Sequence, residues 1–247
     1  MSNPSKTEVI VFSPTRNQTL PTIDCYENGK KFDLNISKHL KVLGVHIDHN
    51  MKWDHHITCL RKKTIGIVRH LHRTNKILPT KTKLKLYDSL VASHLNYADV
   101  IWSGCNQANK QKLQGVQNFA LKSVLQMKKS DSATQALQTL NYLTLEEKRN
   151  IHEAVFTHKV IAGKMPTNLT EDYEKLKSRL NNRSAGKGTL NIPTHKTTRY
   201  ESSILYRSVK AWNKTDESIR DTDTHIFKRH LQTATTQLKY QTSRAKV

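Results

Sequence analysis

The densest group of side chains able to bind an anion lies in two neighbouring stretches of helical periodicity. These residues are Arg61, Lys62, Lys63 and Arg69 in the first stretch, and Lys81, Lys83 and Lys85 at the opening of the second. Positive charge in the opening turns of a helix opposes the helix dipole, so local stability does not explain the second set. A phosphate partner does explain it, and a solvated basic face is the alternative. Contacts of this kind carry little information about base sequence.

The net charge of the chain points to the same class of partner. Lysine and arginine number 41 against 20 aspartates and glutamates, which gives a formal charge of +21. Such an excess opposes compaction and attracts polyanions. Nucleic acid explains it better than an anionic membrane surface or a merely soluble basic surface does. We therefore expect RNA and DNA as partners, bound through the phosphate backbone.

Cysteine usage and hydropathy indicate an intracellular protein. The sequence has three cysteines, an odd number, and they are widely spaced: Cys25, Cys59 and Cys105. This pattern is typical of thiols that pack as small core residues in a reducing compartment. No run of about eighteen apolar residues is present, and the N-terminal residues lack the apolar region of a signal peptide. We expect a nuclear or cytoplasmic location and no membrane partner.

The histidines and carboxylates do not predict a metal site or an active site. Among thirteen histidines, the close pairs are His55-His56 and His70-x-His72, and we assign neither pair a cysteine or carboxylate at ligand spacing. Nucleotidyl transfer by two metals requires carboxylates that bind both ions, and the sequence contains no Asp-Asp pair. It also lacks a Gly-rich phosphate loop and a plausible Ser/His/Asp set. We expect no metal, no bound cofactor and no small-molecule substrate.

The elements that position the basic residues are predicted to be helices that follow a small β portion. Residues 8–47 alternate in hydropathy between turn-forming residues, which predicts an antiparallel β-meander, with Gly44 at a bulge or a close backbone approach. From Trp53 onward, apolar residues recur at steps of three and four, which predicts three amphipathic helices in an antiparallel bundle. Thr144 and Glu147 have the spacing of a capping box and predict the start of a further helix. The fold class is therefore mainly α.

Several motifs, taken in order along the chain, carry a family resemblance. Residues 41–48 read Lys-x-Leu-Gly-Val-x-Ile-Asp, and Trp-x-x-His-Ile follows at 53–57. Later matches are His94-Leu95-x-Tyr97, Leu113-Gln114-x-x-Gln117-Asn118, Lys210-x-Trp212-Asn213 and Phe227-Lys228-x-x-Leu231. This order resembles the end of the palm, the thumb and the following region of reverse transcriptases from non-LTR (LINE-like) retrotransposons. The resemblance covers about residues 3–235, although Lys214-Thr215 replace the Leu-Pro that often follows Trp-Asn.

The resemblance implies roles for particular residues. In that family the Leu-Gly hairpin is the primer grip and the next helices hold the template–primer duplex, so Lys41 and Gly44 would lie at the nucleic acid. Lys6 matches the family's lysine near the departing pyrophosphate, and a solvated turn lysine is the alternative. The family's catalytic aspartates have no counterpart here, so the resemblance implies an RNA-directed DNA polymerase fragment that is inactive alone. Mg²⁺ would be expected only in an intact parent polymerase.

The hydropathy pattern and the resemblance divide the chain into segments. They are palm-remnant strands with the hairpin at 1–50, a helical thumb-like bundle at 51–130, further helices at 131–176, a flexible basic linker at 177–197, a C-terminal helical segment at 198–235 and a disordered tail at 236–247. Two alternatives stay open at this point. One is an unrelated basic helical protein that binds RNA or DNA, and the other is an intact enzyme with an unrecognised metal site.

Overall fold

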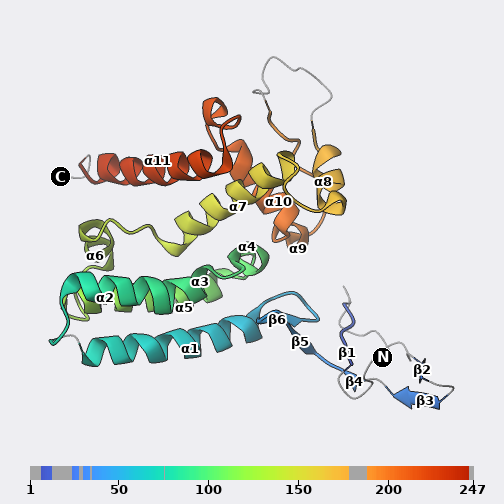
Figure 1. Cartoon of the computed structure of the whole chain (residues 1–247), viewed down its shortest axis with the longest axis horizontal. Helices are drawn as coiled ribbons and strands as arrows, with labels where there is room; N and C mark the ends of the chain where they lie inside the picture. The colour runs from blue at the N-terminus through green and yellow to red at the C-terminus, as the bar shows by residue number, and fades with distance from the viewer. Residues whose placement is uncertain are drawn as a thin grey trace. The chain divides into compact units, whose positions relative to one another are not determined.

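The fold was obtained as a computed structural model, which describes residues 7–12, 24–27, 30–33, 35–74, 76–177 and 188–244. The prediction of a mainly α fold with a small β portion at the N-terminal side is confirmed (Figure 1). Contacts divide the chain into two compact units, Met1–Lys63 and Thr64–Val247. The division falls inside a helix, whereas we expected a boundary at residue 50, where the strands give way to helices.

The described strands of the first unit are short and pair two by two. They are β1 (Glu8–Val9), β2 (Asp24–Glu27), β3 (Lys30–Asp33), β4 (Asn35–Ile36), β5 (His39–Val42) and β6 (Val45–Asp48). β2 pairs with β3 and β5 with β6 in antiparallel ladders, but β1 pairs with β4 in parallel. The prediction of one antiparallel meander over 8–47 is therefore wrong. The intervening β2–β3 hairpin lets β4 run in the same direction as β1.

The β5–β6 hairpin turns at Leu43-Gly44, with Val42 opposite Val45. Both turn residues have positive φ, 46° for Leu43 and 87° for Gly44. Two-residue loops of this kind match the right-handed twist of the strands they join, and glycine reaches positive φ without strain. Gly44 is thus the second residue of a tight turn rather than a bulge, and Leu43 is 87% exposed at the tip.

Helices of varied length follow the β5–β6 hairpin along the chain. They are α1 (Asp54–Arg73), α2 (Thr80–Tyr87), the π-helical turn η2 (Asp88–Ala92), α3 (Ser93–Asn96), α4 (Asp99–Trp102), α5 (Gln107–Val124), α6 (Ala133–Thr139), α7 (Leu145–Ile161), α8 (Thr167–Glu174), α9 (Thr198–Glu201), α10 (Ile204–Asn213), the 3₁₀ turn η3 (Glu217–Ile219) and α11 (Thr224–Arg244). Within the described parts of the chain, none of these helices has an apolar stretch of the length that a membrane crossing needs.

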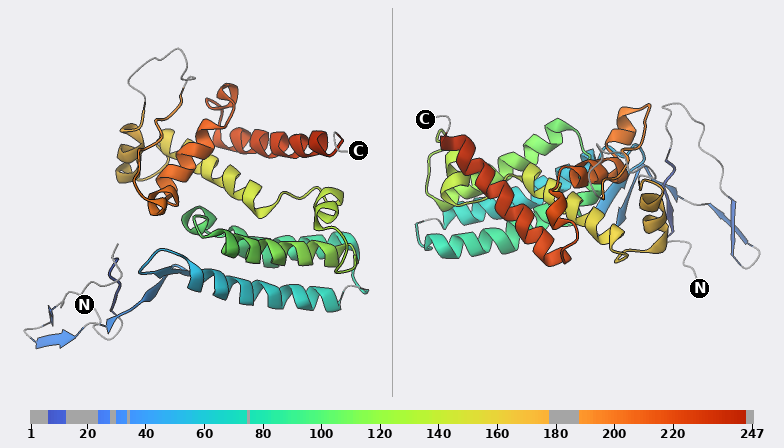
Figure 2. Two further views of the ribbon diagram at one scale, coloured as in Figure 1. Left: turned by 180° about the vertical axis from the view of Figure 1, so that it is seen from behind. Right: turned by 90° about the horizontal axis from the view of Figure 1, so that it is seen from above.

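α7 begins at the predicted capping box and lies at the centre of the second unit. The backbone N–H of Glu147 donates to Thr144 Oγ1 at 3.2 Å, and the N–H of Thr144 donates to Glu147 Oε2 at 2.7 Å. α7 packs against α10 and α11, and these helices lie next to one another in each of the views (Figures 1 and 2). The shared core includes Val160, Val209 and Phe227, all with no exposed surface. The segments expected at 131–176 and 198–235 therefore build one core.

The C-terminal segment departs from the expected disorder. α11 continues to Arg244 and covers most of 236–247, so the prediction of a disordered tail is wrong for these residues. Its first half is anchored by Phe227 and Leu231 against α7 and α10, and the helix continues past that anchor. Most of the linker predicted at 177–197 lies outside the described residues. At its described ends, Lys177 and Leu190 form an antiparallel bridge, and the N–H of Asn191 donates to Leu176 O at 2.8 Å.

Candidate nucleic-acid interface and neighbouring polar sites

The predicted basic residues of the first helix are exposed on α1. Asp54 in the first turn is the single acidic residue of this twenty-residue helix and suits the positive end of its dipole. The apolar stripe is buried, with Ile57 and Val68 at 0% exposure. The basic set, which we call the α1 basic set, consists of Arg61, Lys62, Lys63 and Arg69, and all four side chains are exposed. α1 thus presents five exposed arginines and lysines, this set and Arg73, against one carboxylate at its N-terminal end.

The second predicted set is only partly available. Lys81 and Lys85 are exposed on α2, but Lys83 is 1% exposed, so its expected role as a phosphate contact is wrong. Lys83 precedes Tyr87 by four residues, and Tyr87 precedes Val91 by four. These spacings place all three on one helix face, and that face is buried. The spacing of Lys83 from Tyr87 along the sequence already predicts that Lys83 lies on the buried face of the helix.

The residues expected from the family resemblance lie at the hairpin or outside the described structure. Lys41 is exposed on β5, one residue before the end of that strand, and Gly44 is exposed in the turn. Lys6 lies outside the described residues. The hairpin therefore offers one exposed cation and an exposed leucine, Leu43, at its tip.

One face of the hairpin carries polar side chains. The ladder pairs His39 with Asp48 and Lys41 with His46, so these four side chains share a face, because directly paired residues of antiparallel strands project to the same side. The His39 ring stacks on His55 of α1 with centroids 4.3 Å apart, and the His46 ring meets His55 edge-on at 4.8 Å. Burial, followed by the charges of His55, Lys41 and His39, lowers the pKa of His46.

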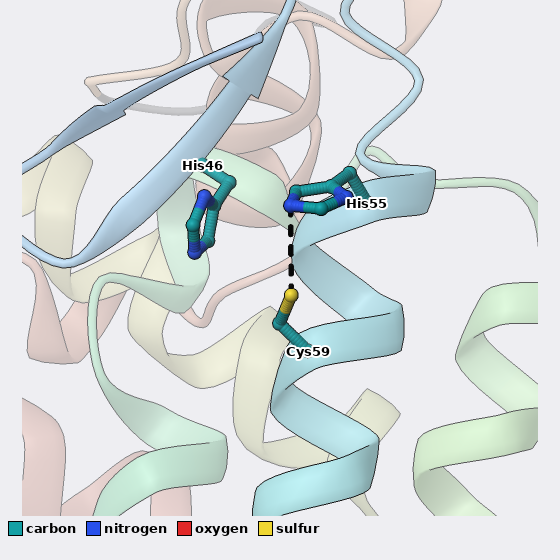
Figure 3. Close-up of side chains that lie close together, drawn as sticks. All are labelled: His46, His55 and Cys59. Atoms are coloured by element: carbon teal, nitrogen blue, oxygen red, sulfur yellow. Dashed lines mark hydrogen bonds between the residues drawn. The ribbon is translucent and has the colours of Figure 1, made fainter.

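His55 and His56 have different surroundings although they are adjacent. His56 is 6% exposed, and its Nδ1 accepts a hydrogen bond from the backbone N–H of His46 at 3.4 Å. Burial, with smaller effects of His46 and His55, lowers the pKa of His56 to about 4. His56 is therefore neutral near pH 7 and fixes β6 beside α1. His55 instead points toward Cys59, whose Sγ lies 3.6 Å from His55 Nε2 (Figure 3).

A cysteine at ligand spacing was missed in the sequence. Cys59 follows His55 by four residues, which is one turn of a helix, so the statement that His55-His56 has no such cysteine is wrong. The four-residue spacing between His55 and Cys59 was enough to predict this pair of ligands. The approach of His46, which comes from another element, could not be read from spacing.

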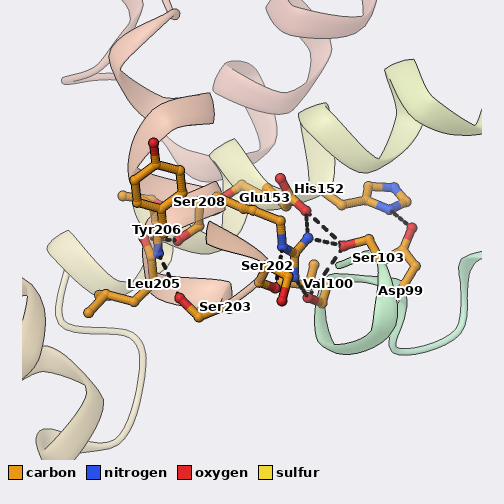
Figure 4. Close-up of polar contacts among 12 residues, drawn as sticks. Asp99, Val100, Ser103, His152, Glu153, Ser202, Ser203, Leu205, Tyr206 and Ser208 are labelled. Atoms are coloured by element: carbon orange, nitrogen blue, oxygen red, sulfur yellow. Dashed lines mark hydrogen bonds and ion pairs between the residues drawn. The ribbon is translucent and has the colours of Figure 1, made fainter. Parts of the chain in front are cut away.

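A buried polar network lies in the second unit, between α4, α7 and α10 (Figure 4). His152 Nδ1 lies 2.6 Å from Asp99 Oδ2, and Ser103 Oγ donates to Glu153 Oε1 at 2.7 Å. Arg207 contacts both Ser103 and Glu153 and donates through Nη2 to Val100 O at 2.9 Å. Ser103 donates to the same Glu153 oxygen that pairs with Arg207, so the network joins α4, α7 and α10.

A cavity of about 330 Å³ adjoins this network. Its lining mixes charges, with the cations Lys110, Arg149, Arg207, Lys210 and Lys214 beside the carboxylates Glu146, Glu147 and Glu153. Arg149 is 4% exposed and lies over the Trp102 ring at 4.8 Å, and its Nε and Nη2 have no hydrogen-bond partner within the described residues. Burial lowers the pKa of this guanidinium, while neighbouring Cys105 and Asp99 act in the opposite direction.

No protein-family model, curated protein or solved structure matches this chain. Its function therefore has to be inferred from its own residues and their positions.

Proposed function

We propose that this chain binds the phosphate backbone of nucleic-acid duplexes, with RNA and DNA as its partners. The observation that carries the proposal is the α1 basic set, four exposed cations on a helix that has a single acidic residue. The net charge of +21 supports it, since an excess of this size favours a polyanionic partner. Lys81 and Lys85 on α2 and Lys41 on β5 add further exposed cations.

A more specific form of the proposal rests on the resemblance to non-LTR reverse transcriptases. In this form the chain is the template–primer binding part of an RNA-directed DNA polymerase, located in the nucleus or the cytoplasm, with the β5–β6 hairpin and α1 at the duplex. It is inactive alone, because the sequence has no Asp-Asp pair to bind catalytic metal ions. The alternative is an unrelated basic helical protein that binds RNA or DNA. A requirement for a primer terminus favours the first form, because a general duplex binder is indifferent to one.

A salt titration tests duplex binding. Neutralising about five phosphates gives a slope of log K against log salt of roughly −4 to −5 on a B-form duplex, with micromolar or weaker affinity at physiological salt. Replacing Arg61, Lys62, Lys63 and Arg69 by Gln removes four cations and should flatten the slope by about 3 units. The affinity for two duplexes of unrelated sequence should fall equally, because backbone contacts do not read bases.

The matched control removes the same charge elsewhere. Its substituted residues are Lys159, Lys196, Lys228 and Arg229, all of them exposed in the second unit. With these four changed to Gln, the slope should stay within about 1 unit of the wild-type slope. Equal slopes for both quadruple variants would show that only net charge matters and that the α1 basic set is a solvated surface. A loss confined to one duplex sequence would indicate base readout.

A further inference from the structure

Three side chains of the first unit bring metal-binding atoms together without any acidic residue among them. His46 comes from β6, and His55 and Cys59 come from the first two turns of α1 (Figure 3). The ligand atoms of the three residues all lie within 4.8 Å of one another, and all three side chains are partly buried. We propose that His46, His55 and Cys59 bind a Zn²⁺ ion that joins the β5–β6 hairpin to the first turns of α1.

The helical pair already has the separation that zinc requires. Zn–S bonds of about 2.3 Å and Zn–N bonds of about 2.0–2.1 Å, at tetrahedral angles, separate sulfur from nitrogen by about 3.6 Å. The distance between His55 Nε2 and Cys59 Sγ is 3.6 Å. Residues four apart on a helix face hold two ligands in this way in helical zinc sites. His46 needs only a small shift toward this pair to complete a three-ligand set.

The ligand types select the ion. One thiolate with two imidazoles suits Zn²⁺ better than Mg²⁺ or Ca²⁺, which prefer oxygen ligands. On binding, the S–H bond of Cys59 breaks, an S–Zn bond forms and one proton leaves to solvent, with no change of oxidation state. Three protein ligands leave the fourth tetrahedral position for a water molecule.

A buried carboxylate on the same face of the hairpin as His46 adds a second observation that favours a cation there. Asp48 is 8% exposed, and its Oδ1 has no hydrogen-bond partner within the described part of the chain. A buried carboxylate oxygen without a partner is costly. Asp48 follows His46 by two residues on β6 and shares its face of the hairpin. A divalent cation with its bound water on that face supplies the positive charge and the hydrogen-bond donor that Asp48 lacks.

The histidines around the site separate into ligands and supports. His56 is excluded as a ligand through Nδ1, because that atom already accepts from the His46 backbone. His39 stacks on the ring of His55 and restricts its orientation. Zinc would therefore add a further link between hairpin and helix, alongside this hydrogen bond and the ring contacts of His55 with His39 and His46.

Co²⁺ serves as the spectroscopic probe for the full chain. We expect one Co²⁺ per chain, with visible bands of a tetrahedral site and a near-ultraviolet thiolate-to-cobalt band, and we expect one equivalent of Zn²⁺ to displace it. The Cys59→Ala variant should lose the thiolate band. The His46→Ala and His55→Ala variants should bind Zn²⁺ at least tenfold more weakly in competition with a chromophoric chelator. Asp48→Asn should weaken binding about tenfold and keep the band.

The controls make the test decisive. His70 is an exposed histidine on the same helix, so His70→Ala should bind Zn²⁺ as the wild type does. Far-ultraviolet circular dichroism establishes that each variant keeps its helices, and Cys59→Ser replaces Cys59→Ala if helix content falls. A wild-type chain without a thiolate-to-cobalt band overturns the proposal. So does a band that persists without Cys59, since it would come from Cys25 or Cys105.

Discussion

Glu153 of α7 and Arg207 of α10 form an ion pair in which both side chains are largely buried, at 6% and 13% exposure. Ser103, just after α4, donates to the same carboxylate oxygen, and Arg207 also donates to two backbone carbonyls, those of Val100 and Ser202. Three helices are thus joined through one charged pair. Burial lowers the pKa of Arg207, whereas Glu153 beside it raises that pKa, so the carboxylate offsets part of the cost of burying the guanidinium charge.

Removing one partner of this pair should destabilise the second unit strongly. Glu153→Ala leaves the Arg207 charge buried without its counterion, and we expect a loss of about 3–5 kcal/mol in the free energy of unfolding. Urea unfolding followed by tryptophan fluorescence measures it. The control is Asp172→Ala, which breaks an exposed pair with Lys175 and should cost less than about 1 kcal/mol. Equal losses in the two variants would contradict the role assigned to the buried pair.

Replacing two glycines by alanine, one at a time, should change the free energy of unfolding in opposite directions. A Cβ at Gly104 would lie 2.1 Å from Ser202 O, so Gly104→Ala must push backbone apart and should cost about 1–3 kcal/mol. Gly115 lies inside α5, where a Cβ would meet nothing within 4 Å. Gly115→Ala should stabilise by about 0.5–1 kcal/mol. Thermal unfolding of both variants measures the two signs, and a stabilised Gly104→Ala would refute the close approach.

The capping box of α7 should contribute measurably to stability. Thr144→Ala removes the acceptor for the Glu147 N–H and should cost about 1 kcal/mol. Thr233→Ala is the matched control, because Thr233 is exposed in the middle of α11 and its hydroxyl donates to Arg229 O within the same helix. It should change the free energy of unfolding by less than about 0.5 kcal/mol. Chemical denaturation compares the two variants.

Alkaline pH should destabilise the second unit through Tyr87. Burial raises the pKa of the Tyr87 hydroxyl to about 12, although the nearby Gln117 side chain acts to lower it. The folded state thus favours the neutral phenol, so this contribution is complete below pH 10 and is lost as the pH rises from 10 to 12. Two pKa units correspond to about 2–3 kcal/mol.

The Tyr87→Phe variant separates this effect from general alkaline unfolding. Without the hydroxyl, the loss of stability between pH 10 and 12 should be smaller by up to that amount, as measured by urea unfolding at each pH. Tyr200→Phe, which alters a ring that is 37% exposed, should reproduce the wild-type pH profile. Identical profiles for Tyr87→Phe and the wild type would show that Tyr87 ionises without cost to the fold.

The chain alone should not synthesise DNA. The sequence has no Asp-Asp pair, so we expect no template-dependent extension of an RNA or DNA primer with Mg²⁺ or Mn²⁺. A primer-extension assay measures this, with an active reverse transcriptase as the positive control. Incorporation that survives removal of contaminating polymerases would reveal a metal site that the carboxylate pattern does not show.

Local patterns in the sequence determined the elements that depend on neighbours along the chain. The recurrence of apolar residues at steps of three and four predicted the helices after Trp53, and the pair Thr144 and Glu147 predicted where α7 begins. Both follow from backbone geometry over a few residues. The burial of Lys83 was also readable, because its spacing from Tyr87 places it on the apolar face.

Only the tertiary structure decided which elements meet. The parallel pairing of β1 with β4, the ion pair between Glu153 and Arg207 and the approach of His46 to Cys59 each join residues that are distant along the sequence. Periodicity carries no information about such partners, because it describes one element at a time. Which residues come into contact depends instead on packing and on the burial of charge over the whole unit. Both are set only when the chain is folded.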